Sequence, residues 1–197
     1  MQMEHRHHGK SSANFLDSDE ILQELDFSGN ETFMDAGCGD GHIALKALKD
    51  YLPEGCAYAV DNHKESIEEL EAYKSENNIE NLIVIEADLT KGIKDVKEES
   101  IDVVLMLNVF HGFKASGDMD AVIDELIKTI KDDGRIALMD FKAIDMQKGP
   151  PTEIKSTPDE LEELFSNHGL KMTYLNEELG EDIPEGKSHF IMIFEKD

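Results

Sequence analysis

The segment 35–41, Asp-Ala-Gly-Cys-Gly-Asp-Gly, has the composition of a loop that holds a nucleotide-like ligand. Its glycines, Gly37, Gly39 and Gly41, alternate with other residues between an apolar run and an amphipathic stretch. Glycines where a strand turns into a helix leave room for a ligand against the backbone, with an anionic group near the helix N-terminus. The spacing G-x-G-x-G is one residue short of the dinucleotide fingerprint G-x-G-x-x-G. A tight turn that needs glycine only for its dihedral angles is the alternative interpretation.

Three polar side chains, Asp61, Asp88 and Asn108, each follow a later apolar run. Ligands of parallel sheets bind outside the carboxyl ends of the strands, so these side chains are expected to gather at one edge. Asp61 has the position from which a carboxylate accepts hydrogen bonds from ribose hydroxyls. Capping of the next helix by Asp61, and an Asx turn at Asp88, are the alternatives.

His111 follows Asn108 closely and is the candidate general base. An unperturbed imidazole titrates near pH 6.5, so it can take a proton from a hydroxyl or an acidic carbon. Capping of the local loop, or packing against Phe113, is an alternative of equal weight.

Metal and thiol chemistry are not favoured by the sequence. His5, His7 and His8 form a weak candidate metal cluster, but a solvated terminal arm explains them as well, so no metal is expected. Cys38 and Cys56 are too few for a disulfide framework or a four-thiolate zinc site.

From residue 31 onward, short apolar runs alternate with longer amphipathic stretches, which is typical of βα units around a parallel sheet. Strands are expected at residues 32–36, 57–61, 82–86, 101–107 and 135–140. Helices are expected at residues 42–51, 64–74 and 118–130, with a further short helix over 21–25.

The last quarter of the chain departs from this alternation. Thr157, Pro158 and Glu160 supply a helix N-cap, a first-turn proline and a capping-box glutamate, which predicts a helix to residue 167. Strands at 171–176 and 188–195 follow without an intervening helix and are expected to pair antiparallel. The predicted fold is a three-layer, Rossmann-like α/β sandwich, with a mostly parallel seven-stranded sheet and an antiparallel last strand.

The amino-acid composition limits the classes of partner that the protein is expected to bind. The chain has 197 residues, with 19 Lys and Arg against 44 Asp and Glu, so its net charge is −25. Contacts to phosphates need Lys or Arg, so neither nucleic acid nor an anionic membrane is expected as a partner. No apolar run approaches the roughly 20 residues that span a bilayer, and the start lacks the apolar stretch of a signal peptide. A cytoplasmic protein, either monomer or homodimer, is expected.

The segment 35–41 resembles the first motif of class I S-adenosylmethionine-dependent methyltransferases, and the resemblance extends from about residue 31 to the C-terminus. It implies one methyltransferase domain over 1–197, in which an arm and helix at 1–30 cover the pocket of a Rossmann-like core at 31–197. It also implies S-adenosylmethionine as cofactor, with ribose at Asp61 and adenine at Asp88 and Leu89. The implied cofactor-binding residues are Asp35, Gly37, Cys38, Gly39, Gly41, Asp61, Asn62, Asp88, Leu89 and Asn108.

The resemblance further implies methyl transfer to a small-molecule acceptor by in-line displacement. Residues 108–111 are most similar to small-molecule methyltransferases of the quinone-biosynthesis type, which often carry a histidine near this point. A non-catalytic, S-adenosylmethionine-binding regulatory protein is the main alternative. An NAD-dependent dehydrogenase is a weaker alternative, because the glycine spacing disfavours it.

Overall fold

In the computed structural model of the protein, which describes residues 16–197, seven strands form one sheet of order β3-β2-β1-β4-β5-β7-β6. The strands are β1 (Thr32–Ala36), β2 (Cys56–Asp61), β3 (Leu82–Glu86), β4 (Ile101–Leu107), β5 (Ile130–Phe141), β6 (Leu170–Ile183) and β7 (Gly186–Lys196). The helices are α1 (Ser18–Glu24), α2 (His42–Asp50), α3 (Lys64–Asn77), α4 (Phe110–Ser116), α5 (Met119–Thr129) and α6 (Pro158–Asn167), with 3-10 turns η2 (Leu89–Lys91) and η3 (Thr152–Ile154).

The direction of each strand determines which strand ends share one edge of the sheet. The four strand pairs from β3 to β5 are all parallel, so the carboxyl ends of these five strands lie at the same edge. Strand β7 runs antiparallel to both β5 and β6, so its first residues return to that edge. The predicted sheet, with its antiparallel last strand, is confirmed.

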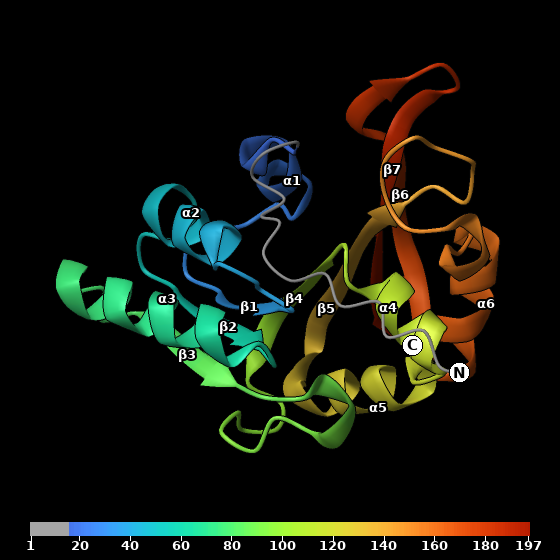
Figure 1. Cartoon of the computed structure of the whole chain (residues 1–197). Helices are drawn as coiled ribbons and strands as arrows, with labels where there is room; N and C mark the ends of the chain where they lie inside the picture. Colours follow the sequence, from blue (N-terminus) through green and yellow to red (C-terminus); the bar gives the residue numbers. More distant parts are fainter. Residues whose placement is uncertain (1–15) are drawn as a thin grey trace.

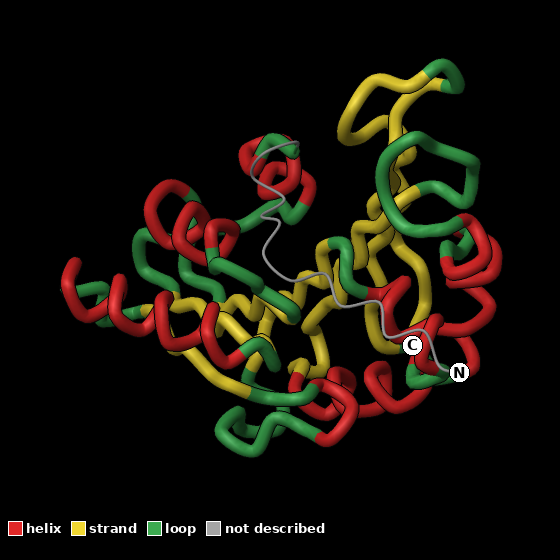
Figure 2. The backbone as a smooth tube through the Cα atoms, viewed as in Figure 1, coloured by secondary structure: helices red, strands yellow, loops and turns green. Residues whose placement is uncertain are grey.

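Helices cover both faces of the sheet (Figures 1 and 2). One buried apolar cluster joins the sheet to α1, α2 and α3, and a second joins the opposite face to α4, α5 and α6. Each helix turns its apolar stripe toward the sheet, as α5 does with Val122, Ile123 and Leu126. The result is the predicted three-layer sandwich.

Strands β1 and β4 lie side by side in the middle of the sheet. Phe33 pairs with Val103 and Met34 pairs with Val104, and all four side chains are fully buried. Strands covered on both faces read as continuous apolar runs, which is why the sequence marks β4 so clearly.

Two boundaries differ from the sequence prediction. Helix α4 was not expected; it has only seven residues, contains Gly112 and lacks a capping side chain at Val109, so it carries no start signal. Strand β5 begins at Ile130 instead of Arg135, because Ile130 already pairs with Ile101 of β4. Tertiary pairing therefore decides where α5 ends.

Strands β6 and β7 form a longer hairpin than expected. The pairing continues to Ile183 and Gly186 through several register shifts, beyond the predicted end at residue 176. The acidic stretch 177–185 carries no alternation of apolar and polar residues, so the sequence pattern alone does not predict a strand there.

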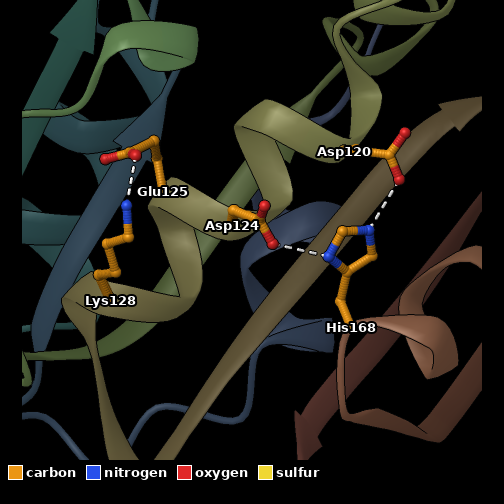
Figure 3. Close-up of polar contacts among 5 residues, drawn as sticks. All are labelled: Asp120, Asp124, Glu125, Lys128 and His168. Carbon is orange, nitrogen blue, oxygen red and sulfur yellow. Dashed lines mark hydrogen bonds and ion pairs between the residues drawn. The ribbon is translucent and has the colours of Figure 1, made fainter.

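His168 joins α6 to α5 through two carboxylates (Figure 3). Its Nδ1 lies 2.7 Å from an Asp124 oxygen, and its Nε2 lies 2.8 Å from an Asp120 oxygen. Two carboxylate partners require both ring nitrogens to be donors, which is the imidazolium form. Burial lowers the pKa of His168, but the hydrogen bonds and charges of the two aspartates outweigh it and raise the pKa above its ordinary value.

A His168→Gln variant is expected to lose about 1 kcal/mol of stability in acid and almost none in alkali. The folded-state pKa is raised, so the contribution of His168 is complete below the unfolded pKa, near 6.5, and disappears as pH rises through the folded pKa. Urea unfolding of both proteins between pH 5 and 9 measures this difference. A difference that stays constant across the range would contradict the charged clamp.

Candidate functional site

The candidate residues line up along the carboxyl edge of the sheet. From β3 toward β5, the strand order brings Asp88, Asp61, the glycine loop at 37–41 and Asn108 into one row. His111, in the first turn of α4, continues this row toward β5. The sequence-predicted residues therefore meet at the topological position where parallel sheets bind ligands.

The glycine loop is held by backbone hydrogen bonds. The amides of Gly37 and Cys38 both donate to the Val60 carbonyl, at 2.7 and 3.0 Å, and the Gly41 amide donates to the Cys38 carbonyl. All three glycines have positive φ, which is +54° at Gly39. The loop therefore needs glycine for its conformation, as the turn interpretation held.

The surroundings of the three glycines separate packing from open space. A Cβ on Gly37 would lie 2.6 Å from Val109, and one on Gly41 would lie 2.5 Å from Leu70. A Cβ on Gly39 would meet nothing within 4 Å. Only Gly39 therefore faces space that a ligand can occupy.

Asp61 connects β2 to the glycine loop. One of its oxygens accepts from the Gly39 amide and the other accepts from the His63 amide, both at 2.8 Å. The N-cap of α3 is His63, whose ring accepts from the Ser66 amide, so capping by Asp61 was the wrong alternative. Asn62, between them, is exposed.

Asp88 caps η2, as its alternative interpretation stated. One oxygen accepts from the Thr90 amide and hydroxyl, and the other lies 2.7 Å from the Lys91 ammonium. The Lys91 and Thr90 hydrogen bonds hold the pKa of Asp88 below its usual range. Leu89 beside it is buried. A role for this pair at adenine stays a prediction.

Two buried polar groups near the loop have unsatisfied atoms. Within the described residues, Asp35 Oδ2 has no hydrogen-bond partner, and the same holds for both amide atoms of Asn108. Burial raises the pKa of Asp35 to about 7. Asn108 also has a φ of +55°, an unusual conformation for a residue other than glycine. Unpaired buried polar atoms cost stability, so such atoms often mark a ligand site.

His111 forms a buried pair with Asp140 at the end of β5. Its Nδ1 lies 2.8 Å from Asp140 Oδ1, and its backbone amide donates to Oδ2 at 2.9 Å. Phe141 donates its amide to the same carboxylate, which fixes the orientation of Asp140. Capping of the local loop, or packing against Phe113, stays a prediction beside this contact. Sequence reasoning missed Asp140, although an acidic residue at a strand end was the available signal.

Three more residues near this pair were not predicted from the sequence: Phe141, Lys155 and His189. All three are buried, and they come from the end of β5, the loop after it and the start of β7. Only the antiparallel return of β7 brings His189 to this edge, where it pairs with Phe141.

Thiol and metal chemistry find no support in residues 16–197. Burial raises the pKa of the Cys38 thiol, so it is not a nucleophile at neutral pH. Within these residues no three His, Cys, Asp or Glu side chains are grouped to hold a metal ion, and His5, His7 and His8 lie outside them. No helix in the same range is long and apolar enough to cross a membrane.

The edge suits the cofactor that the sequence motif implies. S-adenosylmethionine presents an ammonium, a carboxylate, ribose hydroxyls and an adenine amine. The unpaired Asp35 oxygen and Asn108 amide are complementary to its charged amino-acid end. The open space at Gly39 adjoins Asp61, which accepts a hydrogen bond from the Gly39 amide. The residues present therefore fit this group.

Comparisons with known proteins agree on the fold. The sequence matches a family described as a methyltransferase domain over residues 27–193. An S-adenosylmethionine-dependent methyltransferase from Aquifex aeolicus has a TM-score of 0.79 and 21% identity, over 94% of this chain and 93% of that one. No curated protein sequence matches significantly.

Two further solved structures share the fold, but their names state different activities. Mitomycin 7-O-methyltransferase MmcR has a TM-score of 0.71 and 18% identity, over 91% of this chain and 53% of that one. The [4+2]-cyclase SpnF has a TM-score of 0.72 and 12% identity, over 91% and 79%.

Proposed function

Because this chain belongs to the family of class I S-adenosylmethionine-dependent methyltransferases, we propose that it methylates a small molecule at the carboxyl edge of its sheet. S-adenosylmethionine is its cofactor. The observation that carries the proposal is the order of groups along this edge. The polar groups suited to the cofactor lie at the ends of β3, β2, β1 and β4, and the His111–Asp140 pair follows after β4 and β5.

In this proposal each strand end binds one part of the cofactor. Asp88 and Leu89 hold adenine, Asp61 holds ribose, and Gly39 leaves room for the chain between ribose and the amino-acid end. Asp35 and Asn108 bind that amino-acid end, which satisfies their unpaired atoms. A cofactor held by these residues would supply its methyl group on the side of β4 and β5, where His111 lies.

When bound, S-adenosylmethionine supplies an electrophilic methyl group on a positively charged sulfur. His111 Nδ1 donates to Asp140, so the neutral ring carries its lone pair on Nε2; this tautomer is assigned from the hydrogen-bond network. Nε2 takes the proton of the acceptor as the nucleophile forms, and Asp140 stabilises the resulting imidazolium.

Two observations support a small-molecule acceptor. The net charge of −25 opposes the binding of nucleic acid. A structural neighbour, MmcR, is named for O-methylation of mitomycin, a small molecule. The similarity of residues 108–111 to quinone-biosynthesis-type enzymes places quinols first among the acceptors to test.

The alternative, a regulatory protein that binds S-adenosylmethionine, differs from the proposal only because it does not transfer the methyl group. The match to SpnF, a cyclase by name, illustrates that this fold is compatible with other reactions. Acceptor-dependent production of S-adenosylhomocysteine separates an active methyltransferase from a protein that only binds the cofactor.

Calorimetric titration with S-adenosylhomocysteine tests the cofactor site, with Asp61→Ala as the variant. Loss of charge-assisted hydrogen bonds to ribose is expected to weaken binding about 10- to 100-fold. Asp132→Ala is the matched control, since this exposed aspartate lies at the opposite end of β5 and forms an ion pair with Lys196. NADH is titrated in parallel and is expected to give no response.

Failure of the folded, ligand-free wild type to bind S-adenosylhomocysteine would overturn the proposed site. Binding of NADH in its place would favour the dehydrogenase alternative. Equal affinity in Asp61→Ala and wild type would remove the ribose role from Asp61.

A further inference from the structure

Lys155 is a buried ammonium without an ion pair. The residue is 3% exposed, and its Nζ donates one hydrogen bond, to the Ile144 carbonyl at 2.7 Å. No carboxylate of residues 16–197 lies within ion-pair distance of it. Burial lowers the pKa of Lys155, while the more distant charges of Asp145 and Asp140 act to raise it. A buried charge is expensive unless it is paired, so two unused donors on this ammonium require an explanation.

The backbone around Lys155 is firmly placed. Lys114 of α4 donates its ammonium to the Lys155 carbonyl at 2.6 Å and also contacts Glu160 in the first turn of α6. The turn η3 ends one residue before Lys155, whose own amide donates to the Thr152 carbonyl. These contacts fix the backbone of Lys155, and the hydrogen bond to the Ile144 carbonyl fixes its ammonium.

His189 presents a second unused donor. Its Nδ1 lies 2.7 Å from the Ser188 hydroxyl oxygen, which already accepts from the Glu181 amide. The hydroxyl can also donate, and with its hydrogen directed to Nδ1 the neutral ring carries its own hydrogen on Nε2; we assign this tautomer. Burial lowers the pKa of His189 to about 4, so the ring is neutral at pH 7. Nε2 is buried and has no partner among the described residues.

Phe141 lies between these donors and the proposed base. Its ring centroid is 4.2 Å from that of His189 and 6.0 Å from that of His111. The Lys155 ammonium is 6.0 Å from the same centroid. One aromatic ring thus adjoins a cation, a neutral donor and the imidazole of the His111–Asp140 pair.

We propose that Lys155 and His189 bind a carboxylate on the methyl acceptor, so that small organic acids are preferred to uncharged acceptors such as quinols. The inference rests on the proposed function, since it concerns the acceptor side of the same site. A carboxylate has two oxygens that accept from an ammonium and from an imidazole N–H, which would satisfy both sets of unused donors. Phe141 gives this carboxylate an apolar neighbour, which favours an aromatic or unsaturated acid.

The net negative charge of the protein makes a local cation such as the Lys155 ammonium important for binding an anion. A chain of net charge −25 repels anions at a distance, so an acid is retained only if a local positive group attracts it. A buried ammonium does so with little screening by salt.

Benzoate and benzamide are the probes, because they share a shape and differ in charge. We expect benzoate to bind the protein saturated with S-adenosylhomocysteine at least tenfold more tightly than benzamide, as measured by calorimetry. Lys155→Met is expected to abolish this preference, and Lys155→Arg to retain part of it. Lys171→Met is the matched control, because Lys171 is exposed on β6.

Each result decides the inference. If the folded wild type shows no preference for benzoate, the carboxylate site is wrong, whether or not Lys155→Met folds. If Lys155→Met keeps the preference, the anion binds elsewhere and the inference also fails. A wild type that ignores S-adenosylhomocysteine but still prefers benzoate through Lys155 would overturn the proposed function and retain the anion site.

Discussion

Replacement of His111 by alanine is expected to lower kcat about 100- to 10,000-fold, the usual contribution of a positioned general base. The affinity for S-adenosylhomocysteine should change less than about twofold, because the ring, which contacts Asp140, is assigned to the proton of the acceptor and not to the cofactor. Kinetics with an acceptor identified by screening quinols and hydroxybenzoates measure the first value, and calorimetry measures the second.

Asp140→Asn tests the same pair from its other side. An amide in place of the carboxylate can donate to Nδ1 and so favours the wrong tautomer of His111, which lowers kcat. The substitution also lowers stability, because each Asp140 oxygen accepts from a backbone amide, so kcat is compared where the variant is folded. Asp140 acts through His111, so it is a positioning residue. The pH at which kcat falls to half should therefore shift in this variant, which a merely structural contact would not cause.

His168→Ala is the control for stability. It removes another histidine–aspartate contact, on α6, so it is expected to lower stability without lowering kcat at temperatures where the protein is folded. Equal kcat in wild type and His111→Ala would remove the general base from the mechanism and leave positioning as its main component.

Gly39→Ala is expected to separate cofactor binding from folding. The φ of +54° costs an alanine about 1–2 kcal/mol, while its Cβ meets no protein atom within 4 Å. The methyl group would instead occupy the space assigned to the cofactor, so affinity for S-adenosylhomocysteine should fall at least about 100-fold, because overlap with a bound ligand is not relieved by small shifts. Urea unfolding and calorimetry give the two values.

Gly169→Ala is the matched control for this strain. Gly169 has a φ of +75° and its Cβ would also meet nothing within 4 Å, but it follows α6, away from the glycine loop. Both variants are expected to lose similar stability, and only Gly39→Ala should lose affinity. If Gly39→Ala binds as well as Gly169→Ala does, the cofactor does not lie against Gly39.

Sequence pattern predicted the sheet because its central strands are buried on both faces and read as apolar runs. The glycine loop and the acids after β2 and β3 were predictable for a related reason, since each lies at the end of such a run. Cap residues such as Thr157 were equally readable, and the structure has the predicted capping box with Glu160.

The remaining part of the site depends on long-range pairing, which leaves no local signal. Asp140 meets His111 across 29 residues of sequence. His189 reaches the same edge only because β7 runs antiparallel to β5, and a lone histidine in a strand does not reveal this. Lys155 is one of many lysines in the sequence, and only the fold shows that it is buried.

The paired strands β1 and β4 also form a stiff junction between two halves of the sheet. It joins the half of the sheet that carries most of the proposed cofactor groups to the half that carries Asn108 and His111, and its paired side chains are fully buried. Close-packed cores deform little, so the two halves keep a fixed separation. In-line transfer loses much of its rate when the reacting atoms are displaced by about 1 Å. Stiffness at this junction would therefore keep the methyl donor and the methyl acceptor aligned without a separate element that closes over them.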